Sequence, residues 1–257
     1  MEPWRGNLLN VFKLLSRTNV AGSEVSHPQP LAFQAGEKIG SRETTRELIL
    51  NAAIRLFRER GFDETTMREV ASEVGVALGL AYYYFPSKEA LVMAYYERVQ
   101  REHRIVAQQN LPHTRALRDR LAMLLNTKLD ILKDDRKLLG ALFRYTGSPD
   151  HPLSFLGKNT APLRADCMSL FAEALEPERL PDDLRELLPL LIWALHMGVL
   201  LYFLYDASPN LRRTRRLVDG SVGLVVGFLG LAKSPLLRPV RRSVMTLLRD
   251  ARLIPRS

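Results

Sequence analysis

From about Ser41 onward, the apolar positions of this chain recur at the three- and four-residue spacing of amphipathic helices. Thr44 and Glu47 have the pattern of a capping box near the start of the first helix, and the alternative is a boundary a few residues earlier. Gly61 predicts its end, because glycine adopts the left-handed conformation without a steric penalty. No stretch alternates between apolar and polar residues for long enough to predict a strand, so the pattern indicates an all-α fold. The first apolar stripe consists of Leu48, Ile49, Ala52, Ala53, Leu56 and Phe57.

Two short helices separated by a glycine-containing turn follow this first helix. Thr66 and Glu69 form a second capping-box pattern, and Gly75 predicts the end of that helix. The next short helix stops at Pro86, because proline has no amide hydrogen to donate. Two helices joined by a three- or four-residue turn that contains glycine are typical of a helix-turn-helix, which we place at residues 66–85.

The same pattern predicts which side chains of the second short helix are buried. We expect Ala81, Tyr82 and Phe85 to face the core, because they lie at helical spacing along one side. Tyr83 and Tyr84 are then the exposed rings of the aromatic run.

Longer helices are predicted for the rest of the chain. Ser87 has the residue type of a helix cap and begins a fourth helix that we expect to run to about Ala107. Proline and glycine positions separate the later helices. The expected spans are 115–133, 135–146, 152–176, 182–206, 210–232 and an amphipathic 239–252.

The predicted helices and linkers divide the chain into four parts. Residues 1–40 form a leader that we expect to be disordered or to contain a short amphipathic helix. Residues 41–107 form the helix-turn-helix domain, and residues 112–233 form a larger helical domain. Residues 234–257 form a basic C-terminal helix or tail.

The net charge of +9 is concentrated at one end of the chain. Residues 207–257 contain eleven basic and two acidic side chains, whereas residues 41–110 contain ten of each. The basic total therefore does not by itself indicate DNA binding by the helix-turn-helix. We interpret the basic C-terminal end as a solvated surface, with DNA or an anionic membrane as the alternatives.

The residue types and their spacing give little support for catalysis or metal binding. Cys167 is the only cysteine, which excludes an intramolecular disulfide framework and a cysteine-rich zinc module. The five histidines lack the spacing of metal ligands. We therefore expect no metal, no cofactor and no enzymatic activity.

Leu187–Tyr205 contains no formally charged residue and has the length of a membrane span. Pro189 and His196 lie inside it, and a helix that is apolar all round is equally typical of a core or a subunit interface. Glycines four residues apart follow it and favour close helix packing. We interpret 182–206 and 210–232 as a dimer interface; a membrane-anchored protein that uses 187–205 as its span is the alternative.

Residues 43–103, and especially 62–91 (FDETTMREVASEVGVALGLAYYYFPSKEAL), resemble the DNA-binding domain of TetR-type transcriptional regulators. The resemblance rests on the helix that ends at Gly61, the Thr65-Thr66 start, the Glu73-Val74-Gly75-Val76 end, and Lys88-Glu89-x-Leu91. It implies a cytoplasmic homodimer that binds a palindromic double-stranded DNA operator and is released by a small ligand, most often as a repressor. It also implies a larger C-terminal helical domain for ligand binding and dimerisation.

The resemblance assigns DNA contacts to the start of the second helix, the recognition helix and the start of the fourth helix. The recognition helix departs from the family pattern at Ala77, Leu78 and Leu80, which offer only apolar contact, for example to a thymine methyl group. Arginines near the motif and tyrosine hydroxyls add phosphate donors. The candidate DNA-binding residues are Arg46, Thr66, Arg68, Ala77, Leu78, Gly79, Leu80, Tyr83, Tyr84 and Lys88.

A ligand site in the larger domain is predicted from polar and aromatic residues on otherwise apolar helices. The expected effector is a small apolar or aromatic molecule. The candidates are Arg144, Tyr145, Trp193, His196 and Tyr202. The remaining alternative is a helical ligand carrier whose helix-turn-helix is only structural.

Overall fold

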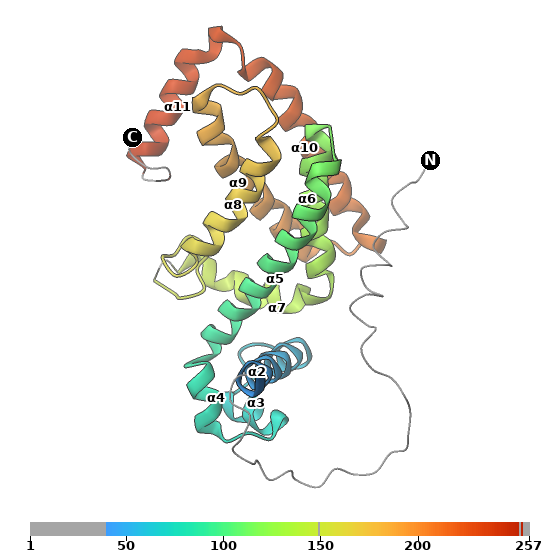
Figure 1. Ribbon diagram of the computed structural model, residues 1–257, viewed down its shortest axis with the longest axis vertical. Helices are drawn as coiled ribbons and strands as arrows, with labels where there is room; N and C mark the ends of the chain where they lie inside the picture. Colours follow the sequence, from blue (N-terminus) through green and yellow to red (C-terminus); the bar gives the residue numbers. More distant parts are fainter. Residues whose placement is uncertain (1–39, 149, 252, 254–257) are drawn as a thin grey trace. The chain divides into compact units, whose positions relative to one another are not determined.

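The computed structural model describes residues 40–148, 150–251 and 253 (Figure 1). The predicted leader lies outside these residues except for Gly40. All regular elements of the described part are helices, which confirms the all-α fold.

The helix-turn-helix and its flanking helices follow the local sequence signals closely. They comprise α2 (Gly40–Glu59), α3 (Met67–Val74), α4 (Leu78–Tyr84) and α5 (Lys88–Asn110). Thr66 and Glu69 form the predicted capping box, and Gly75 has the left-handed φ of 73°. Helix α2 begins at Gly40, so the boundary lies at the earlier of the two predicted places and Thr44 lies inside the helix.

The second half of the chain forms a bundle of longer helices (Figure 1). The prediction of a helix from residue 152 is wrong, since residues 151–160 form turns and α8 begins only at Ala161. Thr160 holds these turns, because its hydroxyl donates to the carbonyl of Ser154 at 2.6 Å. The helices are α6 (Leu117–Leu132), α7 (Arg136–Phe143), α8 (Ala161–Leu175), α9 (Asp182–Tyr205), α10 (Arg212–Ala232) and α11 (Arg238–Asp250), with short 3-10 turns η1 (Leu111–His113), η2 (Lys133–Asp135), η3 (Arg144–Gly147), η4 (Pro209–Leu211) and η5 (Pro235–Leu237).

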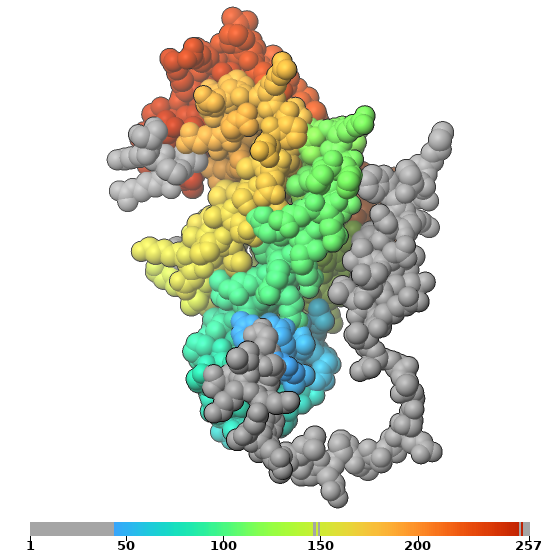
Figure 2. Space-filling view, viewed as in Figure 1, coloured from blue at the N-terminus to red at the C-terminus, as the bar shows by residue number. Residues whose placement is uncertain are grey.

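One apolar core runs through residues 49–229 and joins the helix-turn-helix to the larger bundle. Helix α5 is the continuous link, because it packs on α2 at its beginning and on α6 and α8 further along. On the face shown in Figure 2, the green surface of α5 and α6 adjoins the yellow and orange surface of α8 and α9. The helix-turn-helix and the larger bundle therefore share one continuous apolar core.

The C-terminal helix α11 packs against α9. Met245 and Leu187 form a small apolar cluster between them, and Arg241 donates to Asp183 at 2.7 Å. Arg249 also pairs with Glu186, at 2.9 Å. Part of the basic C-terminal end is thus neutralised within the protein rather than solvated.

Candidate nucleic-acid interface

Helix α4 is held on the domain by the side of the helix centred on Ala81. Ala81 is fully buried and Phe85 is 2% exposed. Leu78 and Tyr84 lie on either side of this line and are partly buried against the core. The expectation that Tyr82 faces the core is wrong: consecutive residues are about 100° apart around a helix, and Tyr82 is 46% exposed.

The opposite side of α4 and the turn before it form an exposed surface. Ala77 and Gly79 are exposed, Leu80 is 39% exposed, and Tyr83 is 70% exposed. Tyr82 joins them, although the periodicity of the sequence placed it inside. This surface offers two phenolic hydroxyls and an apolar contact, and it has no charged side chain on α4 itself. We name Ala77, Gly79, Leu80, Tyr82 and Tyr83 the recognition surface.

The start of α3 adds polar groups next to this surface. The Thr66 hydroxyl accepts from the amide of Glu69 at 3.2 Å, and the Glu69 carboxylate accepts from the amide of Thr66 at 2.8 Å. The Thr66 hydroxyl also donates to this carboxylate at 2.9 Å. The hydrogen bonds from the Thr66 amide and hydroxyl lower the pKa of Glu69, and Arg60 pairs with the carboxylate at 3.0 Å. Arg68 is exposed in the first turn of α3 and is available to a phosphate.

Two predicted contacts, Lys88 and Arg46, are already engaged with the protein. The Lys88 ammonium donates to the carbonyls of Phe62 at 2.8 Å and Asp63 at 3.1 Å, and it lies 4.7 Å from the centre of the Phe62 ring. Lys88 therefore ties the start of α5 to the loop between α2 and α3. The Arg46 guanidinium lies 5.0 Å from the centre of the Phe85 ring.

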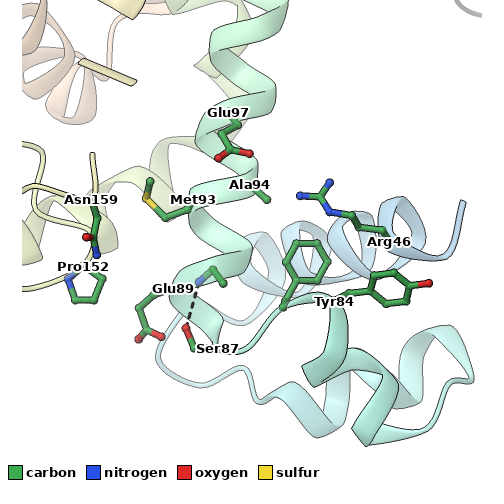
Figure 3. Close-up of a pocket in the computed structure, with 11 residues that line it drawn as sticks. Arg46, Tyr84, Ser87, Glu89, Met93, Ala94, Glu97, Pro152 and Asn159 are labelled. Atoms are coloured by element: carbon green, nitrogen blue, oxygen red, sulfur yellow. Dashed lines mark hydrogen bonds between the residues drawn. The ribbon is translucent and has the colours of Figure 1, made fainter. Parts of the chain in front are cut away.

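Arg46 and Tyr84 lie at one end of a surface pocket of about 520 Å³, and Pro152 and Asn159 lie at the other (Figure 3). The first turns of α5 form its floor. Two carboxylates, Glu89 and Glu97, line it. The pocket shares Arg46 and Tyr84 with the predicted DNA contacts, but its acidic lining does not suit a phosphate.

Most arginines of the helix-turn-helix domain are paired with acidic groups. Ion pairs connect Arg55 with Glu73, Arg60 with Glu69, Arg98 with Glu47, Arg104 with Asp166 and Glu173, and Arg58 with Asp135. The partners of Arg55, Arg60 and Arg98 lie within residues 41–110, whereas Arg58 and Arg104 pair with acidic groups of the larger bundle. Contacts with phosphate must therefore come from a few unpaired cations, hydroxyls and backbone amides.

The loop between α2 and α3 also contacts the larger bundle. Arg144 forms an ion pair with Asp63, and the Tyr145 hydroxyl donates to the same carboxylate at 2.9 Å. Both hydrogen bonds lower the pKa of Asp63, and the one from Tyr145 has the larger effect. The Tyr145 ring stacks on His151 with 4.0 Å between ring centres. Arg144 and Tyr145, both predicted as ligand contacts, thus connect the larger bundle to the loop of the helix-turn-helix domain.

Asp135 makes a second connection between the halves. It is 2% exposed, it pairs with Arg58 of α2, and it accepts from the Tyr95 hydroxyl of α5 at 2.6 Å. Burial and the neighbouring carboxylate raise the pKa of Tyr95. One buried acid thus holds α2 and α5 at the junction of α6 and α7.

The other three ligand candidates all lie on α9 and face different ways. Trp193 and His196 are buried one turn apart, while Tyr202 is 41% exposed. The Trp193 ring packs edge-on to Phe155, and the His196 ring packs edge-on to Phe171. Of the five predicted ligand residues, the structure therefore brings only Trp193 and His196 to the interior of the bundle together.

Helix α9 has the length and apolarity of a membrane span, with a mean hydropathy of 2.1 over its most apolar window, of which 44% is buried in the protein. The segments Pro209–Ala232 and Pro235–Asp250, which contain α10 and α11, reach that apolarity only when they are taken together. The two segments are bent by 93° relative to each other. Within the described ranges, no three histidine, cysteine or acidic side chains are grouped as a metal site.

Two stretches of the chain match models of known protein families. Residues 49–95 match the family model of bacterial regulatory proteins of the tetR family, and residues 120–247 match the tetracyclin repressor-like C-terminal domain. The chain belongs to the TetR family. It has both the helix-turn-helix domain and the C-terminal helical domain of this family of regulators.

Individual relatives of this TetR-family regulator match it over short stretches. The match to the uncharacterised HTH-type regulator YerO of Bacillus subtilis (strain 168) is 47% identical over 19% of this chain and 17% of YerO. The match to the HTH-type regulator BetI of Brucella suis (strain ATCC 23445 / NCTC 10510) is 35% identical over 30% of this chain and 42% of BetI. The chain thus spans less than half the length of these curated relatives.

Solved TetR-family structures share the fold over a longer stretch. A TetR regulator from Nitrosomonas europaea ATCC 19718 is 17% identical with a TM-score of 0.58, over 70% of this chain and 96% of that one. Thermus thermophilus FadR, a TetR-family repressor solved in complex with lauroyl-CoA, is 24% identical with a TM-score of 0.53, over 70% of this chain and 93% of that one.

Proposed function

We propose that this TetR-family regulator is a cytoplasmic, non-catalytic repressor that binds a palindromic operator as a homodimer and is released by a small ligand. Two exposed apolar stripes, one on α9 and one on α10, are the observation that carries the proposal. They give the chain exposed apolar rows on two helices, which a second copy of the chain can cover.

The stripe on α9 is exposed although its residues are apolar or small. Leu191 and Leu201 are each 46% exposed and Tyr205 is 79% exposed. Ala194 and Gly198, between them, are exposed too. These five positions recur at alternating spacings of three and four residues, which is the pattern of a helix seam that packs on another helix.

The stripe on α10 has the same repeat. Leu217, Leu224 and Leu231 are spaced seven residues apart and are 40%, 64% and 60% exposed. Phe228, at 65%, lies beside them. Monomeric proteins seldom expose apolar side chains in such continuous rows, so the two stripes favour a partner surface.

Glycines along α10 strengthen the case for a partner helix. A Cβ atom added at Gly220, Gly223, Gly227 or Gly230 would meet nothing within 4 Å inside the protomer. Each glycine in a helix interior costs about 1 kcal/mol relative to alanine. Packing within the protomer gives no reason for that cost, whereas close approach of a second helix does. We name the apolar and glycine positions of α9 and α10 the dimer surface.

Operator binding is assigned to the recognition surface with Thr66 and Arg68 beside it. Leu80 and the Cα of Gly79 suit contact with thymine methyl groups. The hydroxyls of Tyr82 and Tyr83 suit phosphate oxygens. In a dimer, two recognition helices about 34 Å apart would read successive turns of the major groove.

Ligand release requires that the bundle and the helix-turn-helix move together. The ties from Asp63 to Arg144 and Tyr145, and from Asp135 to Arg58, provide that coupling. A ligand that favours one bundle conformation then shifts the population of recognition-helix positions. FadR, with the same fold, binds lauroyl-CoA, so this fold accommodates a small-molecule ligand in at least one protein.

Selection of bound sequences from random duplex DNA by the purified, detergent-free chain tests the proposal. We expect an enriched palindrome. Replacing Arg68 by alanine should then lower the affinity for that palindrome. It should also reduce the slope of log affinity against log salt concentration by about one, because one phosphate contact is lost. Arg101→Ala is the matched control, because Arg101 is exposed on α5 about 20 Å along the helix from Lys88.

Three outcomes would contradict the proposal. A folded dimer that enriches no sequence would favour the ligand carrier with a structural helix-turn-helix. Extraction only with detergent would favour the membrane-anchored alternative. An equal loss of affinity in Arg68→Ala and Arg101→Ala would remove α3 from the interface.

A further inference from the structure

Four polar side chains meet inside the bundle, away from the recognition surface and the dimer surface. Gln100 and His103 lie three residues apart on α5, Lys128 lies on α6, and His196 lies on α9. Each is at least nine-tenths buried, with exposed fractions of 6%, 0%, 5% and 3%. The Lys128 ammonium donates to the Gln100 amide oxygen at 2.9 Å. We name these four residues the buried polar cluster.

The hydrogen bonds within the buried polar cluster leave several polar atoms without a partner. The buried Nε2 of Gln100 and the Nδ1 atoms of His103 and His196 have none among the described residues. The Nε2 of His103 lies 2.9 Å from the carbonyl oxygen of Leu124, which can only accept, so Nε2 carries the proton and Nδ1 is an acceptor. Buried polar atoms of folded proteins are nearly always hydrogen-bonded, so these atoms point to something that binds there.

The charge in the buried polar cluster also lacks a counterion. Over the described part of the chain, no carboxylate lies within ion-pair distance of the Lys128 ammonium. The nearby Asp166 is bound by Arg104. Burial lowers the pKa of Lys128 to about 8 and that of His196 to about 3, and Lys128 adds to the latter shift. At neutral pH the cluster is therefore a buried single positive charge with a free amide donor beside it.

We propose that the buried polar cluster binds the carboxylate of the effector, and that the effector is a small monocarboxylate with an apolar body. This inference rests on the proposed ligand control of the repressor. The ammonium of Lys128 and the amide of Gln100 donate to the two carboxylate oxygens. His196, whose Nδ1 is free, donates in the tautomer that protonates that atom.

The surroundings of the buried polar cluster suit the apolar body. Leu124, whose carbonyl accepts from His103, and Phe171, whose ring packs edge-on to His196, are both fully buried apolar residues. A water molecule would satisfy one or two polar atoms but would leave the buried ammonium without an anion. A carboxylate pairs with the ammonium and accepts from Gln100 and His196, although it has no proton to donate to the acceptor Nδ1 of His103. The pairing matters most, because a buried charge is stable only when it is paired and hydrogen-bonded.

Calorimetry on the full-length protein tests the inference with two pairs of probes. Decanoate and 2-naphthoate represent chain-like and flat carboxylates, and 1-decanol and 2-naphthol are their uncharged counterparts. We expect at least one carboxylate to bind ten-fold or more tightly than its alcohol. Lys128→Met should abolish that preference, whereas Lys137→Met, on an exposed position of α7, should keep it. Gln100→Leu should weaken carboxylate binding several-fold.

The probe pairs on the unaltered protein decide the matter even if a core variant fails to fold. Equal binding of acids and alcohols, a preference that persists in folded Lys128→Met, or binding of neither acid would overturn the inference. Operator selection is scored separately. Operator binding without carboxylate binding would refute this site and leave the regulator intact, and failure of operator selection would refute the proposed function.

Discussion

Replacing Leu224 by alanine should weaken the dimer without weakening the protomer. Leu224 is 64% exposed on α10, so most of its side chain contacts solvent in the single chain. In the proposed dimer the same side chain is buried against a partner helix. The substitution removes three carbon atoms from that contact and leaves the fold of the protomer almost unchanged.

The structure sets the size of the effect. Burial of one carbon group contributes about 0.8 kcal/mol, so the three lost groups represent about 2.4 kcal/mol if fully buried. About two thirds of this, roughly 1.5 kcal/mol, becomes available only on dimerisation, because the rest is already buried in the protomer. A two-fold interface contains the residue twice. The dimer should lose about 3 kcal/mol, which raises its dissociation constant about 100-fold.

Sedimentation velocity over a range of concentrations measures this constant directly. Leu236→Ala is the matched control, because Leu236 is 87% exposed on η5 and lies outside the dimer surface. Circular dichroism and urea unfolding, extrapolated to the monomer, should be the same for both variants. Operator affinity should fall in Leu224→Ala alone, since each protomer by itself holds only one half-site.

Two results would refute the reasoning. An unchanged dissociation constant in Leu224→Ala would mean that the stripe on α10 does not contact a partner. An equal loss in Leu236→Ala would mean that exposed leucines in general, and not the dimer surface, drive association.

Three further predictions concern local structure and charge. Thr66→Ala removes the cap of α3 and should lower the free energy of unfolding by about 1 kcal/mol, whereas Thr66→Ser should restore most of it in urea titrations. Asp135→Asn should cost about 1–3 kcal/mol in the same assay, because Arg58 and Tyr95 lose a charged acceptor; a change within error would remove Asp135 from the junction. The Lys128 ammonium has a folded pKa of about 8 against an ordinary value of 10.5, so the unfolded state binds more protons between these values and stability should rise with pH there. That rise should vanish in Lys128→Met, and a rise of equal size in both proteins would assign it to other groups.

The sequence did not predict correctly which side chains of a short helix are buried. Helical periodicity located α4 but not the width of its buried side, since Tyr82 and Tyr84 both adjoin a buried line through Ala81 and Phe85. Packing on the neighbouring helices decided that Tyr84 is partly buried and Tyr82 is exposed. Residues 151–160 were misassigned for a similar reason, because Thr160 contacts the carbonyl of Ser154 in a turn that apolar spacing does not encode.

The sequence by itself determined the features that depend on neighbouring residues. The Thr66–Glu69 capping box, the left-handed Gly75 and the stop at Pro86 each act within a few residues, so the helix-turn-helix was predictable along with its family. Tertiary structure alone decided what distant residues do together. It placed Arg144 and Tyr145 on the loop of Asp63, and it gathered the buried polar cluster from three helices, because such contacts depend on how helices pack and not on spacing along the chain.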